Sequence, residues 1–100
     1  MAVTASPIQA FISGTTTPLT TPTVTAIPVN GIAPFSYAWA YSSGDVGLTC
    51  NSPGVASTSW TANLPPAQEK ISVWRCTVTD STPGVPQTAF VSVTVDIRRN

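Results

Sequence analysis

The chain contains no histidine among its 100 residues, and charged residues make up 8% of it, against about 25% in an ordinary globular domain. Without histidine, the Ser-His and Cys-His pairs that activate most catalytic nucleophiles are excluded. The four acids, Asp45, Glu69, Asp80 and Asp96, fall in two predicted loops, at a strand end and near the terminus. They offer neither a carboxylate pair in a cleft nor enough oxygens for calcium, so we expect no enzyme activity.

Positive charge and long apolar runs are also scarce. Two of the four cationic residues stand at the end of the chain, as Arg98 and Arg99, so no basic stripe can neutralise phosphates and no nucleic-acid partner is expected. Apolar runs span a few residues and are interrupted by Pro, Gly or Thr, which argues against a transmembrane helix or a signal peptide. We expect residues 98–100 to be a frayed, solvated tail.

The chain has only two cysteines, Cys50 and Cys76, with neither the paired spacing nor the histidine partner of a zinc site. We therefore expect no metal and no cofactor. A disulfide between them and a pair of buried thiols both remain open. In either case Cys76 alternates in phase with Trp74 and Val78, so we expect it to be buried beside Trp39.

What the sequence does contain is alternation with a period of two, interrupted by turn residues, and this pattern predicts an all-β fold with almost no helix. Its length suits one domain, residues 1–100, around one core. The expected strands span 6–13, 24–29, 35–41, 46–50, 56–62, 71–80 and 88–97. The Thr/Pro tract at 14–22 is expected to be a loop or a kinked edge crossing between strands rather than a glycosylated or linker segment.

The aromatic residues supply both a predicted core and candidate ligand contacts. Residues 35–41 place Phe35, Tyr37, Trp39 and Tyr41 on one face, which favours core packing but also suits a sugar-stacking platform. The expected core residues are Trp39, Trp60, Trp74, Cys76, Val78, Val91 and Val93. The aromatic side chains that could contact a ligand are Phe11, Phe35, Tyr41 and Phe90.

Two segments resemble a known family. Segment 30–39 (NGIAPFSYAW) joins a Gly turn, a Pro-aromatic pair and Tyr-x-Trp, and segment 74–80 (WRCTVTD) ends in Val-Thr-Asp. Both are similar to strands of PKD-like and bacterial or phage immunoglobulin-like domains, and the match spans residues 24–95. The fold this implies is an immunoglobulin-like antiparallel β-sandwich of about seven strands. The chain departs from the pattern in having no cysteine on its second strand and Trp74 where tyrosine is usual.

The resemblance implies a non-catalytic accessory, display or adhesion module of a phage virion, in its capsid or tail, or of a bacterial surface protein. Its location would be the virion or the cell surface, and its partner a protein of that assembly or a cell-surface glycan. The alternative is a carbohydrate-binding β-sandwich that uses exposed aromatic rings. Self-association through open strand edges is a further expectation, limited where Pro7, Pro18 and Pro22 blunt those edges.

Overall fold

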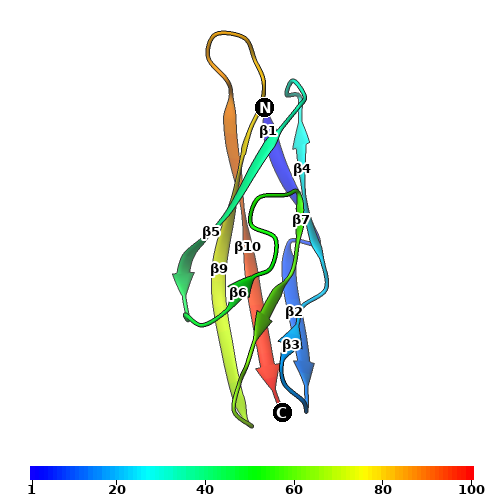
Figure 1. Ribbon diagram of the computed structural model, residues 1–100, viewed down its shortest axis with the longest axis vertical. Helices are drawn as coiled ribbons and strands as arrows, with labels where there is room; N and C mark the ends of the chain where they lie inside the picture. Colours follow the sequence, from blue (N-terminus) through cyan, green and yellow to red (C-terminus); the bar gives the residue numbers. More distant parts are fainter.

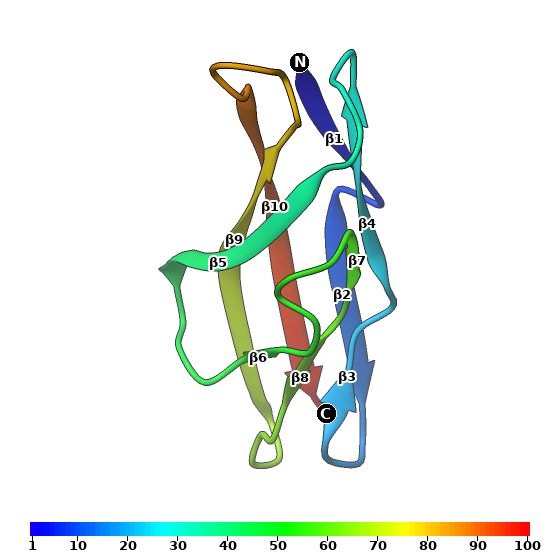
Figure 2. The ribbon, with the colours of Figure 1, turned by 45° about the horizontal axis from the view of Figure 1, so that its top comes forward.

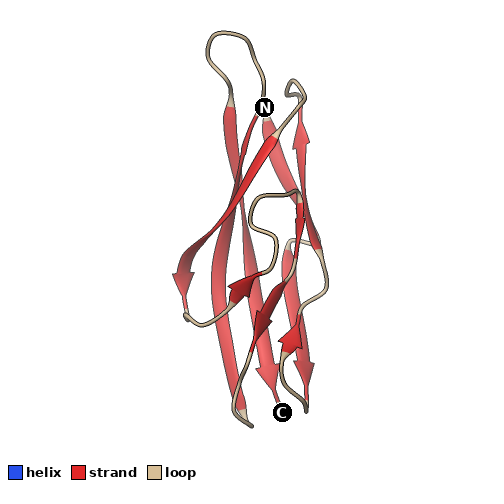
Figure 3. Ribbon diagram, viewed as in Figure 1, coloured by secondary structure: helices blue, strands red, loops and turns tan.

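The computed structural model describes residues 1–100 and contains strands and loops but no helix (Figure 3). This confirms the all-β prediction, which rests on the period-two alternation of the sequence. The ten strands are β1 (Ala2–Ser6), β2 (Gln9–Gly14), β3 (Leu19–Thr20), β4 (Val24–Val29), β5 (Ser36–Gly44), β6 (Thr49–Cys50), β7 (Ser57–Thr58), β8 (Trp60–Ala62), β9 (Gln68–Thr79) and β10 (Thr88–Arg99).

The strands form three open sheets. The largest, called here the four-stranded sheet, has the order β2-β10-β9-β5, with β10 antiparallel to β9 and parallel to β2. Two three-stranded sheets, β1-β4-β7 and β3-β8-β6, make up the opposite layer. Figure 2 shows β3, β8 and β7 in front of β9, β10 and β2. Every sheet has two edge strands, so none closes into a barrel.

The two small sheets are halves of one irregular layer, because β3 runs on into β4 and β7 runs on into β8. Between the halves, the Thr21 N–H donates to the Trp60 carbonyl at 2.9 Å, and the Trp60 N–H donates to Thr21 Oγ1 at 3.0 Å. Pro22 follows immediately and has no N–H for a regular ladder. The side-chain hydroxyl of Thr21 thus completes the pairing where the backbone cannot.

One buried cluster of 14 residues fills the space between the layers. Trp60 is fully buried, and its ring meets the Trp39 ring edge-on, with centroids 5.4 Å apart and planes at 85°. Among the residues expected in the core, Trp74 and Val91 are half-buried at its margin. The members of the cluster are Ala10, Leu19, Val24, Ala26, Trp39, Leu48, Trp60, Ala62, Leu64, Cys76, Val78, Val93, Val95 and Ile97.

The N-terminal strands differ from the prediction. The strand expected at 6–13 is β2, which starts later, and β1 precedes it as an additional strand in the other layer, because Pro7 lies between the two and cannot donate to a ladder. Ile8 is 58% exposed in the connection. The Thr/Pro tract contains the short edge strand β3, which agrees with the expected kinked edge crossing, and Leu19 on that strand is buried.

Three middle boundaries also change. The strand expected at 46–50 shrinks to β6, and the one expected at 56–62 is divided at Ser59 into β7 and β8. The turn expected at 42–45 starts later, because β5 continues to Gly44 through an irregularity between Tyr41 and Ser43. The strands expected at 24–29 and 88–97 are confirmed as β4 and β10, the latter two residues longer.

The expectation of a frayed C-terminus is wrong. Residues Arg98 and Arg99 pair with β9 on one side and with β2 on the other, so the end of β10 is an interior strand. Arg99 Nη1 also donates to the Leu64 carbonyl at 2.8 Å, and the Asn100 N–H donates to the Gly14 carbonyl at 2.8 Å. Backbone partners on both sides hold the segment that composition alone marked as a solvated tail.

The molecule is elongated, with principal extents of 51 × 19 × 16 Å. The β9–β10 and β4–β5 connections and the N-terminus lie at one end of the long axis, and the C-terminus lies at the other (Figure 1).

Candidate functional site

The structure does not bring the four candidate ligand-contact aromatics together. Phe11 on β2 and Phe90 on β10, which are 48% and 56% exposed, lie on the outer face of the four-stranded sheet. Phe11 pairs with Asp96, six residues along β10 from Phe90, so the two rings are about 20 Å apart. The guanidinium of Arg75 already covers Phe90, with its Cζ 4.1 Å from the ring centroid.

Phe35 and Tyr41 lie on the inner side of the same sheet, at opposite ends of the β5 segment. Phe35 is half-buried beside Gly31, where an added methyl group would lie 2.6 Å from the Phe35 ring. Tyr41 is 45% exposed and packs edge-on against Trp74, with centroids 6.0 Å apart and planes at 83°. The aromatic row predicted from the sequence is therefore mainly a packing row with one accessible end.

A different feature stands out at the end of the molecule, where Asp80 links two loops. Asp80 ends the β9 segment and is buried, and its carboxylate accepts four hydrogen bonds. The donors are Thr82 Oγ1 at 2.6 Å, the Gln87 N–H at 2.7 Å, the Thr82 N–H at 3.1 Å and the Ile32 N–H at 3.2 Å. The bond from the Thr82 N–H is a turn-stabilising contact of the kind that an Asp at a strand end commonly makes.

The pKa of Asp80 is lowered to about 2, above all by the Thr82 hydroxyl. Burial opposes this as the next largest effect, and the Gln87, Thr82 and Ile32 amides lower the pKa further. The carboxylate is thus ionised at neutral pH. Its charge is held by donors from two loops that are 48 residues apart in sequence.

Further bonds make the two loops one unit. The Ser81 N–H donates to the Ile32 carbonyl at 2.9 Å, and the Ser81 hydroxyl donates to the Pro34 carbonyl. The N-terminal amino group of Met1 donates to Gln87 Oε1 at 3.0 Å. We call residues 30–35 and 81–87, together with Met1, the loop end.

The two loops of the loop end expose apolar side chains and carry no charged side chain, and the charged amino group of Met1 donates to Gln87. Ile32 is 50% exposed and Val85 is 82% exposed, the largest exposure among the large hydrophobic residues. Residues 30–35 and 81–87 contain no Lys, Arg, Asp or Glu. Pro34, Pro83 and Pro86 restrict the backbone between the fixed points, which reduces the conformational entropy that a partner must remove on binding.

Sequence reasoning did not select Ile32 and Val85, because an isolated apolar residue in a loop has no periodic signal. The Asp-x-Thr spacing of Asp80 and Thr82 was a visible sign of an ordered turn. It could not reveal the contact with Ile32, because the two loops are separated in sequence by the strands β5 to β9.

Two acids predicted to be apart are neighbours in the structure. Glu69 lies on β9 opposite Arg98, and Asp96 is two residues from Arg98 on the same outer face. Burial raises the pKa of Asp96 to about 6, helped by the hydrogen bond and the charge of Glu69 and opposed by Arg98. The two carboxyl groups thus share the outer face of β9 and β10, rather than facing each other across a cleft as the pair of a glycosidase does.

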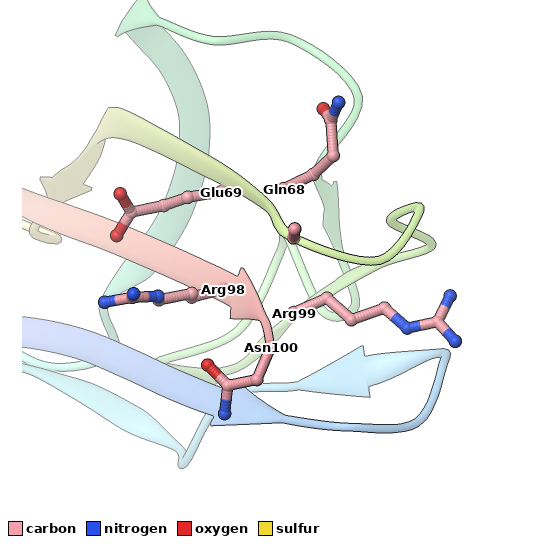
Figure 4. Close-up of a pocket in the computed structure, with 6 residues that line it drawn as sticks. Gln68, Glu69, Arg98, Arg99 and Asn100 are labelled. Carbon is pink, nitrogen blue, oxygen red and sulfur yellow. The ribbon is translucent and has the colours of Figure 1, made fainter.

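Glu69 and Arg98 border an open, polar hollow of about 510 Å³ at the C-terminal end. Glu69 and Arg98 extend side by side, whereas the Arg99 side chain points the other way (Figure 4). The hollow has one apolar lining residue, Ala67. It lacks the predominantly apolar walls typical of small-molecule sites.

Both cysteines are free thiols, so the disulfide that the sequence left open is not formed in this structure. Cys76 is buried and lies opposite Trp39 in the β5–β9 pairing. Burial raises the pKa of its thiol to about 11, partly offset by a backbone hydrogen bond from Ala38, so the reactive thiolate is disfavoured. Cys50 is half-buried, with its Sγ 3.3 Å from Thr58 Oγ1.

No protein-family model, curated protein or solved structure matches the chain. No three Cys, Asp or Glu side chains converge in a group that could hold a metal ion. The structure also has no helix of the length and hydrophobicity needed to cross a membrane.

Proposed function

We propose that this chain is an immunoglobulin-like domain that serves as a non-catalytic accessory, display or adhesion module of a phage virion or a bacterial surface protein. The observation that carries the proposal is the loop end, where Asp80 fixes two uncharged loops and leaves Ile32 and Val85 exposed.

The strand order supports the immunoglobulin-like assignment. Taking β1 with β2, β3 with β4 and β7 with β8 as single broken strands, the chain has seven strands in all. The first then contributes to both layers, the second, fourth and fifth form one layer, and the third, sixth and seventh form the other. This distribution is that of the immunoglobulin sandwich, in which the second-to-third and sixth-to-seventh loops share one end.

The shape of the molecule supports a contact or display role. The loop end and the C-terminus lie at opposite ends of a 51 Å long body (Figure 1). Attachment through the C-terminal end would hold the loop end away from the attachment point. A partner would meet a preformed apolar surface, whose binding depends on shape and short-range contacts rather than on charge steering.

The test is co-sedimentation of the protein with virions and with bacterial cells, using an Ile32→Ser/Val85→Ser double variant. We expect the parent protein to associate in a saturable manner and the double variant to lose about tenfold in affinity, a loss of about 1.4 kcal/mol. Because the two loops carry no charged side chain, association through Ile32 and Val85 should change little between about 0.05 M and about 0.5 M salt.

Phe90→Ser is the matched control, because Phe90 is also an exposed apolar side chain but lies on the outer sheet face. It should bind like the parent protein. Lack of association with either particle would refute the module proposal, and loss of binding in the Phe90 variant alone would move the contact to the sheet face.

A further inference from the structure

A second hollow, of about 200 Å³, lies at the end of β5, away from the loop end. Its lining residues come from β5, from the connection between β5 and β6, and from β9. Four of its six lining residues are apolar or aromatic. The lining residues are Tyr41, Asp45, Val46, Gly47, Leu48 and Trp74.

The aromatic wall of the hollow is held in place by the fold. The rings of Tyr41 and Trp74 stand at 83° and form a corner. The Trp74 Nε1–H donates to Ser72 Oγ at 2.9 Å, and the Tyr41 hydroxyl donates to the Gly44 carbonyl. Both polar groups of the rings are thus satisfied within the protein, and the ring surfaces are what remain for a ligand.

The loop that closes the hollow is also fixed. The Asp45 N–H donates to the Ile71 carbonyl at 2.9 Å, and Asp45 Oδ2 accepts from the Ile71 N–H at 3.0 Å. Lys70 Nζ donates to the Val46 carbonyl at 2.6 Å. A ligand would therefore enter a preformed site and incur little cost for ordering it.

One negatively and one positively charged side chain beside this apolar corner have unused hydrogen-bonding capacity. Asp45 Oδ1 accepts no hydrogen bond from the chain, and the Lys70 ammonium has three N–H groups, of which one is used. A methyl group added at Gly47 would lie 2.6 Å from Lys70 Nζ, which places the ammonium beside this lining residue. The opposite charges of Asp45 and Lys70 favour a neutral ligand over an ion of either sign.

We propose that this hollow binds a single six-membered sugar ring of a glycan. A pyranose presents an apolar C–H face that can lie on an aromatic ring, and hydroxyls that can donate to Asp45 and accept from Lys70. The volume is below the roughly 300–1,000 Å³ of sites for larger ligands, so one ring fits and a cofactor does not. An apolar side chain of a protein partner would instead cover Asp45 and Lys70 without satisfying them.

The inference adds a ligand to the proposed adhesion module at a site separate from the loop end. The sugar site rests on the proposed function only because both assign a binding role to the chain. The two sites can fail independently, because they share no residue.

The experiment is a glycan array followed by NMR titration of the isotope-labelled protein with the monosaccharide of the best array hit. We expect saturable binding with Kd on the order of 1 mM, as suits one ring, and shifts of the Trp74 indole N–H and of residues 45–48. Tyr41→Ala should weaken binding about tenfold, and Asp45→Asn should weaken it while keeping the loop bond to Ile71.

Phe90→Ala is the control, because its side chain is as accessible as that of Tyr41 but lies on the other face of the sheet. It should bind sugar like the parent protein. The Ile32→Ser/Val85→Ser variant should also keep sugar binding, and Tyr41→Ala should keep the association with virions that depends on the loop end. Thermal melting of each variant checks that it is folded.

Three results would overturn the inference. One is no saturable binding to any array glycan, and another is sugar-induced shifts that avoid the Trp74 indole. The third is equal affinity for an uncharged leucine derivative, which would assign the hollow to a protein side chain. None of these would affect the particle association expected of the loop end, whose loss is measured separately.

Discussion

Trp39 and Trp60 meet at a right angle in the core, but their indole N–H groups have different environments. Trp39 Nε1 donates to the Val55 carbonyl at 2.9 Å and thereby holds the loop that crosses the β5 edge. Trp60 Nε1 is buried with no acceptor. A buried unpaired donor lowers stability by about 1–3 kcal/mol, whereas a typical hydrogen bond contributes about 1 kcal/mol.

The two tryptophans therefore provide a matched pair of substitutions. Changing either to Phe removes a similar ring volume, but Trp39→Phe also loses a hydrogen bond, and Trp60→Phe removes an unpaired donor. We expect the Trp39→Phe variant to be less stable than the Trp60→Phe variant by about 2 kcal/mol. Urea unfolding at pH 7 measures the difference, and the reverse order would show that the Trp60 N–H is satisfied in solution.

The end of β5 lies close to the backbone of β9. Gly44 pairs with Ser72 and has a φ of 93°. A Cβ at this position would lie 2.6 Å from the Ile71 carbonyl oxygen and 2.8 Å from Ser72 Cα. Both are backbone atoms of a paired strand, so they cannot move away without loss of the pairing.

Gly84 supplies the comparison, because its φ of 85° is similar but no atom lies within 4 Å of an added Cβ. Gly84→Ala should cost about 1 kcal/mol for the left-handed backbone alone. Gly44→Ala should cost about 2–3 kcal/mol, because the clash with β9 is added. Equal effects in thermal or urea unfolding would mean that the β5 end relaxes freely, and would weaken the case for a preformed Tyr41–Trp74 hollow.

Asp96 and Asp80 lie at opposite ends of the molecule, and they make its free energy of unfolding depend on pH in opposite directions. The pKa of Asp96 is raised in the folded state from 3.8 to about 6, so the folded state binds more protons in that interval and stability falls as pH rises through it. The pKa of Asp80 is lowered from 3.8 to about 2, so stability is lost as pH falls through that lower interval. From these two groups we expect maximum stability near pH 4.

Substitution separates the two effects. Asp96→Asn should raise stability at pH 7 by about 1 kcal/mol, after allowance for solvent screening, and flatten the curve between pH 4 and about 6. Asp80→Asn should lower stability at pH 7 and flatten the curve below pH 4, and should speed amide exchange in residues 81–87. Melting temperatures measured from pH 2 to about 8 test both, and an unchanged Asp96→Asn profile would contradict the assigned pKa.

The local alternation of apolar and polar residues determined much of this architecture. The alternation in residues 24–29 and 88–97 predicted strands that the structure contains, and the lack of a helical period predicted the absence of helix. The same alternation put Cys76 and Val78 on the core side of β9, where both are buried. These features could be predicted because a period of two depends only on neighbouring residues.

Pairing across long sequence distances decided the rest. The tertiary structure put β1 and β2 in different layers, made Arg98 and Arg99 part of an interior strand, and joined Asp80 to Ile32. It also set the Tyr41 ring at a right angle to Trp74, from a strand 33 residues away. Alternation says which side chains share a face, but not which strand lies beside another or which loops meet. Those choices depend on the packing of the whole core, so the loop end and the hollow could be found only in three dimensions.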